Sequence, residues 1–303
     1  MNFRETMTIF GLNPRDIVAD GHWYRCSTAD HPKKKNGCYM LRPCGSRGYF
    51  RNYALDDEWR EWQDDQPMTL AQRVRADVEL AAARRREAER RMRAVRQMRA
   101  YWGGLPPLRG VQHSYLEGKG LSMLGCTGLR ADGDLLVIPA VHRGALVSLQ
   151  TITPDGEKRY RYGCSIKGAA YALTRPRAVL TCLAEGFATG LAIYQSLPQS
   201  SVVVCFDAGN MVQVASEMNL RGMTVVCADN DWETAGRTGV NTGIQKGRSA
   251  AAALGCGVAY PEGIEGTDWA DALAEWGERG PHRLRMEIMR HVRPAMALTG
   301  GGA

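Results

Sequence analysis

The chain has 303 residues, of which 44% are hydrophobic and 23% charged, as is ordinary for a globular protein. That length predicts two or three domains with cores of their own. No apolar run approaches the roughly 18 residues that a membrane-spanning helix needs, and the first residues do not resemble a secretion signal. Nine cysteines, an odd number, favour reduced thiols and a cytoplasmic protein.

The net charge of +7 is unevenly distributed along the chain. Residues 1–67 are neutral, residues 68–100 carry +6, residues 101–176 carry +4, and residues 177–303 carry −3. A basic middle followed by an acidic C-terminal part indicates a polyanion that one part holds and that carboxylates of another part work on.

The first 66 residues read as a small β-rich module. Asn36-Gly37, followed by the apolar run CYML, is a hairpin signal. The segment DDEWREWQDDQP at residues 56–67 reads as an acidic connector.

One long helix is expected in segment 67–104, because residues 69–102 contain neither glycine nor proline. Its ten arginines face solvent, flank a surface that packs on a neighbour, or hold single-stranded nucleic acid, and the sequence leaves these alternatives open. Segment 105–176 reads as a mixed sheet of strand-like pieces and turns.

From residue 177 the pattern alternates between short β-branched runs and stretches of 10–15 residues with helical character. Such alternation predicts α/β architecture, with a parallel four-stranded sheet flanked by helices in segment 177–280. Residues 281–303 are expected to form a C-terminal helix and a disordered tail.

Acidic side chains recur where the predicted parallel strands end, and in such sheets those ends share one edge. One acid alone is commonly a helix cap, and Asp207 is closest to that interpretation. Carboxylates gathered at one edge repel each other unless a cation joins them, and all-oxygen ligands favour Mg²⁺ or Mn²⁺. The candidate metal ligands, in strand order, are Glu185, then Asp229 and Asp231, then Asp268 and Asp271.

The block 177–276 resembles the Toprim domain, which topoisomerases, bacterial-type primases and some nucleases share. Its signature, a glutamate after the first strand and Asp-x-Asp after the third, is matched by Glu185 and by Asp229 with Asp231. The segments HSYLEGKGL, AEGFATGLAIY, FDAGNM and ADND…NTG resemble primases of plasmids and phages, as does GHWYRCSTADHPKKKNGCY near the N-terminus. The resemblance covers most of the chain.

This resemblance implies a DNA primase, which makes short RNA primers on single-stranded DNA from NTPs with Mg²⁺ or Mn²⁺, for a plasmid, a phage or an integrated element. Glu185 would be the acid/base residue near the attacking 3′-hydroxyl, Asp229 and Asp231 the metal ligands, and Asp268 or Asp271 a supporting ligand. Replicative bacterial primases place an acid four residues after the glutamate, where this chain has Thr189. Either fewer carboxylates then bind the metal, or Asp207 compensates for the missing acid.

No phosphate-loop motif occurs, so a helicase would have to come from another chain. A Toprim nuclease is one alternative, although it would not need the basic block before residue 177. A topoisomerase would need a separate domain with a nucleophilic tyrosine, for which little chain is left. The third alternative is a non-catalytic protein that binds single-stranded DNA in replication.

Basic and amide side chains are candidates for binding triphosphate and template, each contact being sensitive to salt. On an extended strand Arg159 and Arg161 share one face and Lys158 takes the other. The alternatives are a solvated hairpin edge for the cations and helix caps or turns for the amides. The candidates are Lys119, Lys158, Arg159, Arg161, Lys167, Asn210 and Asn241.

Primases of this broad type often begin with a zinc ribbon. Cys26, His31, Cys38 and Cys44 have the spacing C-x4-H-x6-C-x5-C, with His22 nearby. Zinc ribbons usually offer two tight pairs of ligands, and this spacing is looser. We therefore favour a zinc-free module that binds template through its tyrosines, tryptophans and the cluster Lys33–Lys35.

Overall fold

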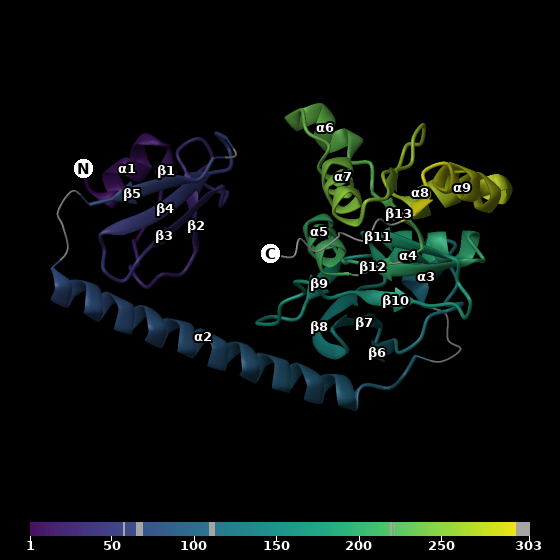
Figure 1. The fold of residues 1–303 in the computed structure, drawn as a ribbon, viewed down its shortest axis with the longest axis horizontal. Helices are drawn as coiled ribbons and strands as arrows, with labels where there is room; N and C mark the ends of the chain where they lie inside the picture. The colour runs from purple at the N-terminus through teal and green to yellow at the C-terminus, as the bar shows by residue number, and fades with distance from the viewer. Residues whose placement is uncertain (57, 65–68, 109–112, 219, 221, 295–303) are drawn as a thin grey trace, which may run out of the picture. The chain divides into compact units, whose positions relative to one another are not determined.

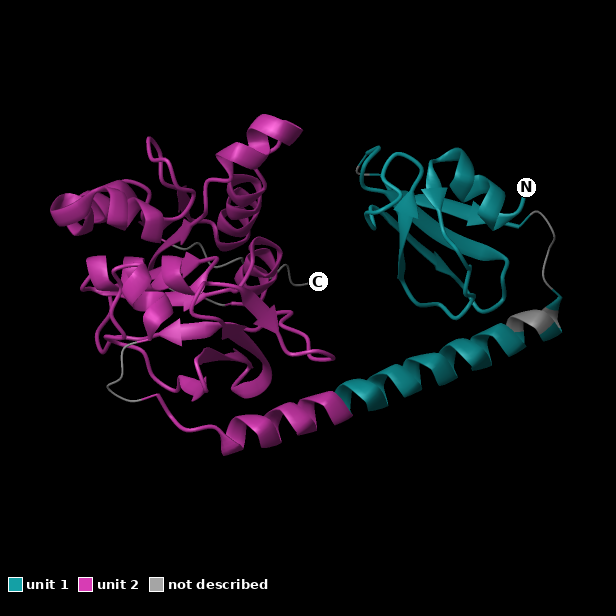
Figure 2. Ribbon diagram, turned by 180° about the vertical axis from the view of Figure 1, so that it is seen from behind, with its two compact units in different colours: residues 1–92 teal, residues 93–303 magenta. Residues whose placement is uncertain are grey.

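The computed structural model describes residues 1–56, 58–64, 69–108, 113–218, 220 and 222–294. Two compact units, residues 1–92 and 93–303, meet within one long helix, α2 (Leu70–Gly104), as Figure 2 shows by colour. The expected long helix is therefore present. Among the described residues, no helix combines the length and apolarity needed to cross a membrane.

Unit 1, residues 1–92, contains an antiparallel sheet of five strands in chain order (Figure 1). The core lies between one face of this sheet and helix α1 (Phe3–Ile9), where Phe3 and Met7 contact Tyr39 and Phe50. At Gly48 a Cβ atom would lie 2.5 Å from the Phe3 ring, so this position has no room for a side chain. The strands are β1 (Leu12–Asn13), β2 (Tyr24–Thr28), β3 (Gly37–Leu41), β4 (Arg47–Asn52) and β5 (Arg60–Gln63).

Two details of the N-terminal prediction were wrong. Asn36-Gly37 does not form a two-residue turn: β2 and β3 pair as expected, but residues 29–36 connect them. β5 pairs with β4 inside the segment that read as an acidic connector, because Trp62 enters the core although acids surround it in the sequence.

Unit 2 contains two sheets, and the first is antiparallel throughout rather than mixed. The C-terminal part of α2 packs on it through Met98, which contacts Val137 and Leu149. Helix α3 (Ser114–Gly118) precedes this sheet. Its strands are β6 (Arg130–Asp132), β7 (Leu135–His142), β8 (Ala145–Ile152) and β9 (Lys158–Tyr160).

The second sheet has six strands in the order β10-β12-β11-β13-β14, with β15 also on β13. Four of them are parallel, as predicted, whereas β10 and β15 are added antiparallel. β10 was expected to belong to the preceding sheet, and that expectation was wrong. The strands are β10 (Tyr171–Leu173), β11 (Leu180–Ala184), β12 (Ser200–Val204), β13 (Met223–Cys227), β14 (Gly257–Ala259) and β15 (Arg293–Pro294).

Helices cover both faces of the six-stranded sheet, because its strands bury alternate side chains on each side. Cys182 and Val225 share a core with Phe187, Trp269 and Leu284, whereas residues such as Val226 pack against helices on the opposite face. The helices are α4 (Phe187–Ser196), α5 (Ala208–Glu217), α6 (Trp232–Thr238), α7 (Thr242–Leu254), α8 (Trp269–Glu275) and α9 (Gly280–Met289). The helix expected after residue 280 is α9, and the tail from residue 295 lies outside the described residues.

Candidate active site

Three of the predicted carboxylates follow two strands that are neighbours in the sheet. Glu185 comes directly after β11, and Asp229 and Asp231 come after β13. Ala184, the last residue of β11, is the register partner of Cys227, the last residue of β13. The tertiary structure thus brings the glutamate and the Asp-x-Asp pair to the same edge of the sheet.

The surroundings of Glu185 disfavour the negative charge of its carboxylate. Its Oε2 atom is buried and has no hydrogen-bond partner among the described residues. Burial and the negative charges of Asp231 and Asp207 raise the pKa of Glu185 to about 7, against the N–H of Ala208 and the charge of Lys158. An unpartnered buried carboxylate oxygen lacks the interaction that a cation or a bound proton supplies.

The surroundings of Asp229 likewise disfavour a negative charge. Burial, followed by the charges of Glu185 and Asp268, raises the pKa of the Asp229 carboxyl well above its ordinary value, and Lys158 opposes the shift. The hydroxyl of Thr189, itself buried on α4, lies 3.5 Å from Asp229 Oδ1. The residue that stands where replicative primases have an acid therefore lies beside the Asp-x-Asp pair.

Asp231 is held by the start of α7. The N–H of Gly243 donates to Asp231 Oδ2 at 2.8 Å, and the N–H of Asp231 donates to Asn241 Oδ1 at 3.2 Å. At Gly243 a Cβ atom would lie 2.4 Å from the carbonyl oxygen of Asp229. Only glycine allows α7 to approach the Asp-x-Asp loop this closely.

The same loop is anchored by Asn230, which lies between the two aspartates. Its side-chain amide donates to the carbonyl of Pro261 at 2.8 Å, and its oxygen accepts from Asn241 Nδ2 at 2.8 Å. Asn241 also caps α7 by accepting from the N–H of Ile244. The side chain of Asn241 therefore fixes the loop that carries Asp231, rather than standing free for a ligand.

Lys158 is a basic residue whose charge acts on these carboxylates. It lies on β9, and its Nζ is 3.6 Å from where a Cβ atom would stand on Gly186, the residue after Glu185. The neighbouring Tyr160 ties β9 to this edge by donating its hydroxyl to the carbonyl of Phe206 at 2.8 Å. The lysine ammonium group therefore lies beside the turn that follows Glu185.

Asp268 and Asp271 are occupied by local contacts. They form a capping box at the start of α8, where Asp268 Oδ1 accepts from the N–H groups of Ala270 and Asp271. Lys119 donates to Asp271 Oδ1 at 3.1 Å. Burial would raise the pKa of Asp271, but hydrogen bonding by Thr267 and the charge of Lys119 lower it. Asp268 contributes to the raised pKa of Asp229. The ammonium group of Lys119 is engaged by Asp271.

The other basic candidates lie elsewhere. Arg159 makes a two-pronged ion pair with Glu157, both contacts at 2.9 Å, and the guanidinium of Arg161 lies 4.6 Å from the Tyr101 ring centroid. Both arginines line a cavity of about 350 Å³ beside α2. Lys167 is exposed in a turn before β10.

Asp207 and Asn210 have structural roles at the start of α5. Asp207 caps this helix by accepting from the N–H of Asn210 at 2.6 Å, which agrees with its helix-cap interpretation. The buried side chain of Asn210 donates to the carbonyls of Ala169 and Cys205 and accepts from the N–H of Gly168. All donors and the acceptor of this amide are thus used within the protein.

We expect Asn210→Ala to destabilise unit 2 by roughly 3 kcal/mol, because three buried backbone groups lose their partner. Thermal unfolding should then begin several degrees lower, whereas Gln245→Ala, at an exposed amide on α7, should leave it nearly unchanged. Equal melting temperatures for Asn210→Ala and wild type would contradict the structural role.

The four candidate zinc ligands do not come together. Cys26 and Cys38 are buried on neighbouring strands as free thiols, and burial raises the pKa of Cys26 to about 11. His31 is exposed in the β2–β3 connection, and the free thiol of Cys44 accepts from the Ser46 hydroxyl. Across the described ranges, no three or more His, Cys, Asp or Glu side chains form a group ready to hold a metal ion, the carboxylates of β11 and β13 included.

The donor chemistry at the sheet edge nevertheless fits a hard divalent cation. Glu185, Asp229 and Asp231 supply only oxygen, the raised pKa values of Glu185 and Asp229 arise from burial and mutual repulsion, and Glu185 Oε2 is unpartnered. A cation bound by these three carboxylates would attract them and so offset their mutual repulsion.

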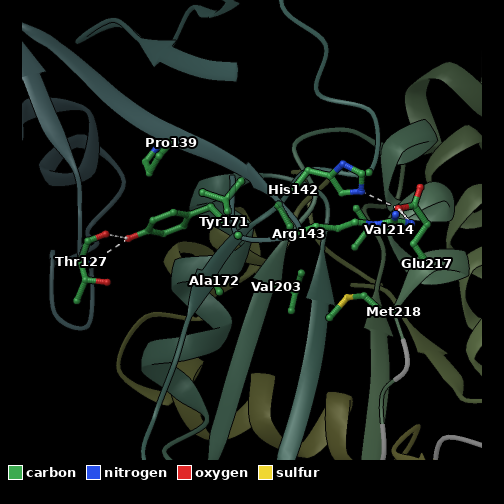
Figure 3. A pocket seen from close by; sticks show the side chains of 14 residues that line it. Thr127, Pro139, His142, Arg143, Tyr171, Ala172, Val203, Val214, Glu217 and Met218 are labelled. Carbon is green, nitrogen blue, oxygen red and sulfur yellow. Dashed lines mark hydrogen bonds and ion pairs between the residues drawn. The ribbon is translucent and has the colours of Figure 1, made fainter. Parts of the chain in front are cut away.

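A separate cavity of about 480 Å³ lies beside the edge strand β10 (Figure 3). At one side Glu217 Oε2 lies 2.7 Å from His142 Nε2, and at the other the Tyr171 hydroxyl bonds to both backbone groups of Thr127. None of the predicted site residues lines this cavity, so it is not part of the carboxylate site.

Sequence reasoning missed the residues that position the carboxylates. Asn230 stands inside the Asp-x-Asp motif, where it read as a spacer, and Tyr160 stands between two arginines in a segment that was weighed for charge alone. Gly243 ends the triplet Asn241-Thr242-Gly243, for which the sequence suggests a nucleotide contact or a cap or turn at Asn241 but no role for the glycine. The available signal was a glycine two residues after a helix cap, which often marks close approach of two backbones.

Residues 181–279 match the family model of the Toprim domain. The matched segment is shorter than half of the chain, and it contains Glu185, Asp229, Asp231, Asp268 and Asp271. The chain thus carries a Toprim domain, and its three central carboxylates lie inside it.

Solved structures resemble the chain at low identity. One similar chain is 14% identical, with a TM-score of 0.40, and the match covers 63% of this chain and 93% of that one. It comes from a structure of the bacteriophage T7 lagging-strand DNA polymerase interacting with primase domains of two gp4 subunits bound to an RNA/DNA hybrid and dTTP. The primase fragment of the bacteriophage T7 primase-helicase protein is 13% identical, with a TM-score of 0.37 and coverage of 58% and 70%.

The RNA polymerase domain of the Mycobacterium tuberculosis primase DnaG is 18% identical, with a TM-score of 0.31 and coverage of 71% and 77%. Likeness at this level establishes no activity and no site residue for this chain.

Proposed function

We propose that this chain is a DNA primase, which joins ribonucleotides from NTPs into short RNA primers on single-stranded DNA. The observation that carries the proposal is the unpartnered, buried Oε2 of Glu185 beside Asp229 and Asp231, within a segment that matches the Toprim domain. Such a site attracts a divalent cation and a phosphate group together.

Glu185 is assigned the proton transfer. A carboxylate with a pKa of about 7 is well matched to taking a proton from the 3′-hydroxyl of the growing primer at neutral pH. Asp229 and Asp231 are assigned the cation, Mg²⁺ or Mn²⁺, which when bound would neutralise the carboxylates and stabilise charge on phosphate oxygens. The assignment is supported by the donor set and its repulsion.

Other residues hold this arrangement in place. Asn230, Asn241 and Gly243 fix the Asp-x-Asp loop through hydrogen bonds of 2.8–3.2 Å. Asp268, whose charge contributes to the raised pKa of Asp229, would support the cation from α8. Asp271 is paired with Lys119 and is assigned the support of the α8 start instead.

Lys158 is assigned the triphosphate. Its ammonium group reaches the turn after Glu185 and is the cation whose charge lowers the pKa values of both Glu185 and Asp229. Arg159, Arg161 and Lys167, which lie away from the carboxylates, are assigned to the template backbone. A plasmid, phage or integrated element as host, and a helicase on another chain as partner, complete the proposal.

The test is incorporation of labelled NTPs on single-stranded DNA of mixed sequence, with Mg²⁺ or Mn²⁺. The expected product is short RNA whose synthesis requires both template and metal and stops with EDTA. Shortening of the template would instead identify a Toprim nuclease. DNA binding without either product, across metals and templates, would contradict catalysis by this chain.

A second prediction concerns the triphosphate. Lys158→Gln should lower kcat/KM for the NTP by about 10- to 100-fold, because one charge-assisted contact to phosphate is lost. Arg285→Gln, which removes an exposed charge from α9, is the matched control and should change kcat/KM by less than about twofold. An unchanged kcat/KM in Lys158→Gln would remove Lys158 from the nucleotide site.

A further inference from the structure

Unit 1 has a second sheet face that its core does not use. Tyr39 and Phe50 are register partners that point into the core with Phe3. Because side chains alternate along strands, their neighbours Cys38 and Arg51, also register partners, belong to the opposite face. Arg25, the partner of Cys38 on β2, continues this row.

Three aromatic rings gather on this opposite side and stay open to solvent. Trp23, Tyr53 and Trp59 keep 52%, 43% and 48% of their surface exposed. The Trp23 and Trp59 ring centroids are 4.7 Å apart, and those of Tyr53 and Trp59 are 6.4 Å apart, both pairs edge to face. An exposed group of three large aromatic rings is uncommon on a surface that only faces water.

Two guanidinium groups complete this aromatic cluster. Arg25 and Arg51 lie 4.5 and 4.4 Å from the centroid of the Tyr53 ring, and Arg51 is also 5.7 Å from that of Trp59. Guanidinium groups stacked on aromatic faces keep their charge while they order the rings. We call these five residues the aromatic platform.

Basic residues outnumber acids in the segment that carries Trp23, Arg25, Arg51 and Tyr53. Residues 21–53 contain seven Lys and Arg and a single acid, Asp30. Lys33, Lys34 and Lys35 are all exposed, and their loop meets the platform where the N–H of Tyr53 donates to the carbonyl of Asn36. Beside Trp59 the acids Asp56 and Glu58 pair with Arg60. The side of the platform next to the Lys33–Lys35 loop therefore carries the charge that complements a polyanion.

A cavity of about 360 Å³ lies in unit 1 between the sheet and the N-terminal part of α2, and His22, the residue before Trp23, helps to line it. Arg42, Arg84 and Arg91 line it, as do Asp20 and Glu87. Both carboxylates have other partners: Asp20 accepts from the Tyr24 hydroxyl, and Glu87 pairs with Arg90. The basic surface thus extends beyond the platform towards α2.

We propose that the aromatic platform is a binding site for single-stranded nucleic acid, independent of metal. Unpaired bases stack on Trp23, Tyr53 and Trp59, and Arg25 and the Lys33–Lys35 loop contact phosphates. Stacking requires base faces that a duplex keeps covered, which selects single strands, and every base has such a face, which makes binding tolerant of sequence. The site belongs to unit 1 and does not depend on catalysis by unit 2.

The test measures fluorescence anisotropy of a labelled oligo-dT of about 20 nucleotides with the full chain in EDTA. Trp23→Ala/Trp59→Ala should bind at least about tenfold more weakly than wild type, because base stacking on two rings is lost. Trp59→Phe, which keeps a ring, should stay within about threefold. Ile9→Ala, a control at an exposed position of α1, should bind like wild type.

Three further measurements make the outcome decisive. Arg25→Gln should weaken binding and flatten its salt dependence without removing a ring, which covers the case in which the tryptophan variant does not fold. Asp229→Asn/Asp231→Asn should bind like wild type, so a failure of catalysis would leave this result intact. The proposal is overturned if the folded tryptophan variant binds as tightly as wild type, if a duplex competes as well as a single strand, or if the chain binds no oligo-dT.

Discussion

Asp229→Asn/Asp231→Asn is expected to lose template-directed RNA synthesis by at least about 10³-fold. Both aspartates follow β13 at the edge where Glu185 follows β11, and they are the assigned cation ligands. Stabilisation of phosphate charge by a bound cation is worth several kcal/mol, and about 4 kcal/mol corresponds to a factor of 10³. The loss should appear in kcat rather than in DNA binding.

The variant should nevertheless fold. Asparagine keeps an oxygen that can accept from the N–H of Gly243, as Asp231 Oδ2 does at 2.8 Å. Neutral side chains also remove the repulsion that raises the pKa of Asp229. We therefore expect a melting temperature in EDTA at or above that of wild type.

Asp132→Asn/Asp134→Asn is the matched control, because it changes two exposed aspartates with the same spacing around the β6–β7 turn. Primer synthesis should stay within about twofold of wild type there. The measurement is labelled NTP incorporation, with circular dichroism and thermal unfolding of each variant. If the Asp229/Asp231 variant kept a tenth or more of the activity, these carboxylates would not be the cation ligands.

Glu185→Gln is expected to lower primer synthesis by about 10²- to 10⁴-fold, the usual contribution of a positioned acid or base. It should also make the metal-free protein more stable at alkaline pH. Glutamine has nearly the same shape but no charge, so it avoids the repulsion by Asp231 and Asp207 that helps to raise the pKa of Glu185 to about 7.

The sign of the pH effect follows from proton binding. The pKa of Glu185 is about 7 in the folded chain, against an ordinary value of 4.5 for a glutamate, so the folded state binds the proton more tightly. The free energy of unfolding of wild type therefore falls as the pH rises from about 4.5 to 7, by at most roughly 3 kcal/mol from this group. The free energy of unfolding of Glu185→Gln should not show this decrease, because glutamine does not titrate.

The measurement is thermal unfolding in EDTA between pH 5 and 8. The melting temperature of Glu185→Gln relative to wild type should rise by several degrees across this range. Mg²⁺ at pH 8 should stabilise wild type more than the variant, because the cation binds the charged site. If the difference in melting temperature between the two proteins did not change with pH, the pKa of Glu185 would not be raised in the folded chain. Glu157→Gln, at an exposed ion pair, is the control.

The sequence by itself determined the α/β part of the fold. From residue 177, apolar runs of strand length alternate with helical stretches, and parallel strands joined in this way must end at one edge. The positions of Glu185, Asp229 and Asp231 at that edge followed from local pattern alone. The parallel order of β12, β11, β13 and β14 agrees with this prediction.

Predictions failed where pairing joins segments that local pattern does not link. β10 follows the antiparallel strands in sequence but pairs with β12, thirty residues further along, in the other sheet. β5 is a strand although acids surround it, because Trp62 finds a place in the core of unit 1. In both cases burial by distant residues outweighs local propensity.

The tertiary structure alone decided which candidates share the site. A lysine or an asparagine looks alike in sequence whether it is free or engaged, since its partners come from distant segments. Lys158 reaches the turn after Glu185, while Lys119 pairs with Asp271, 152 residues away, and Asn210 is used by backbone groups that precede it by about 40 residues. The sequence thus determined which acids reach the sheet edge, because strand ends are local, and long-range packing decided which other groups meet them.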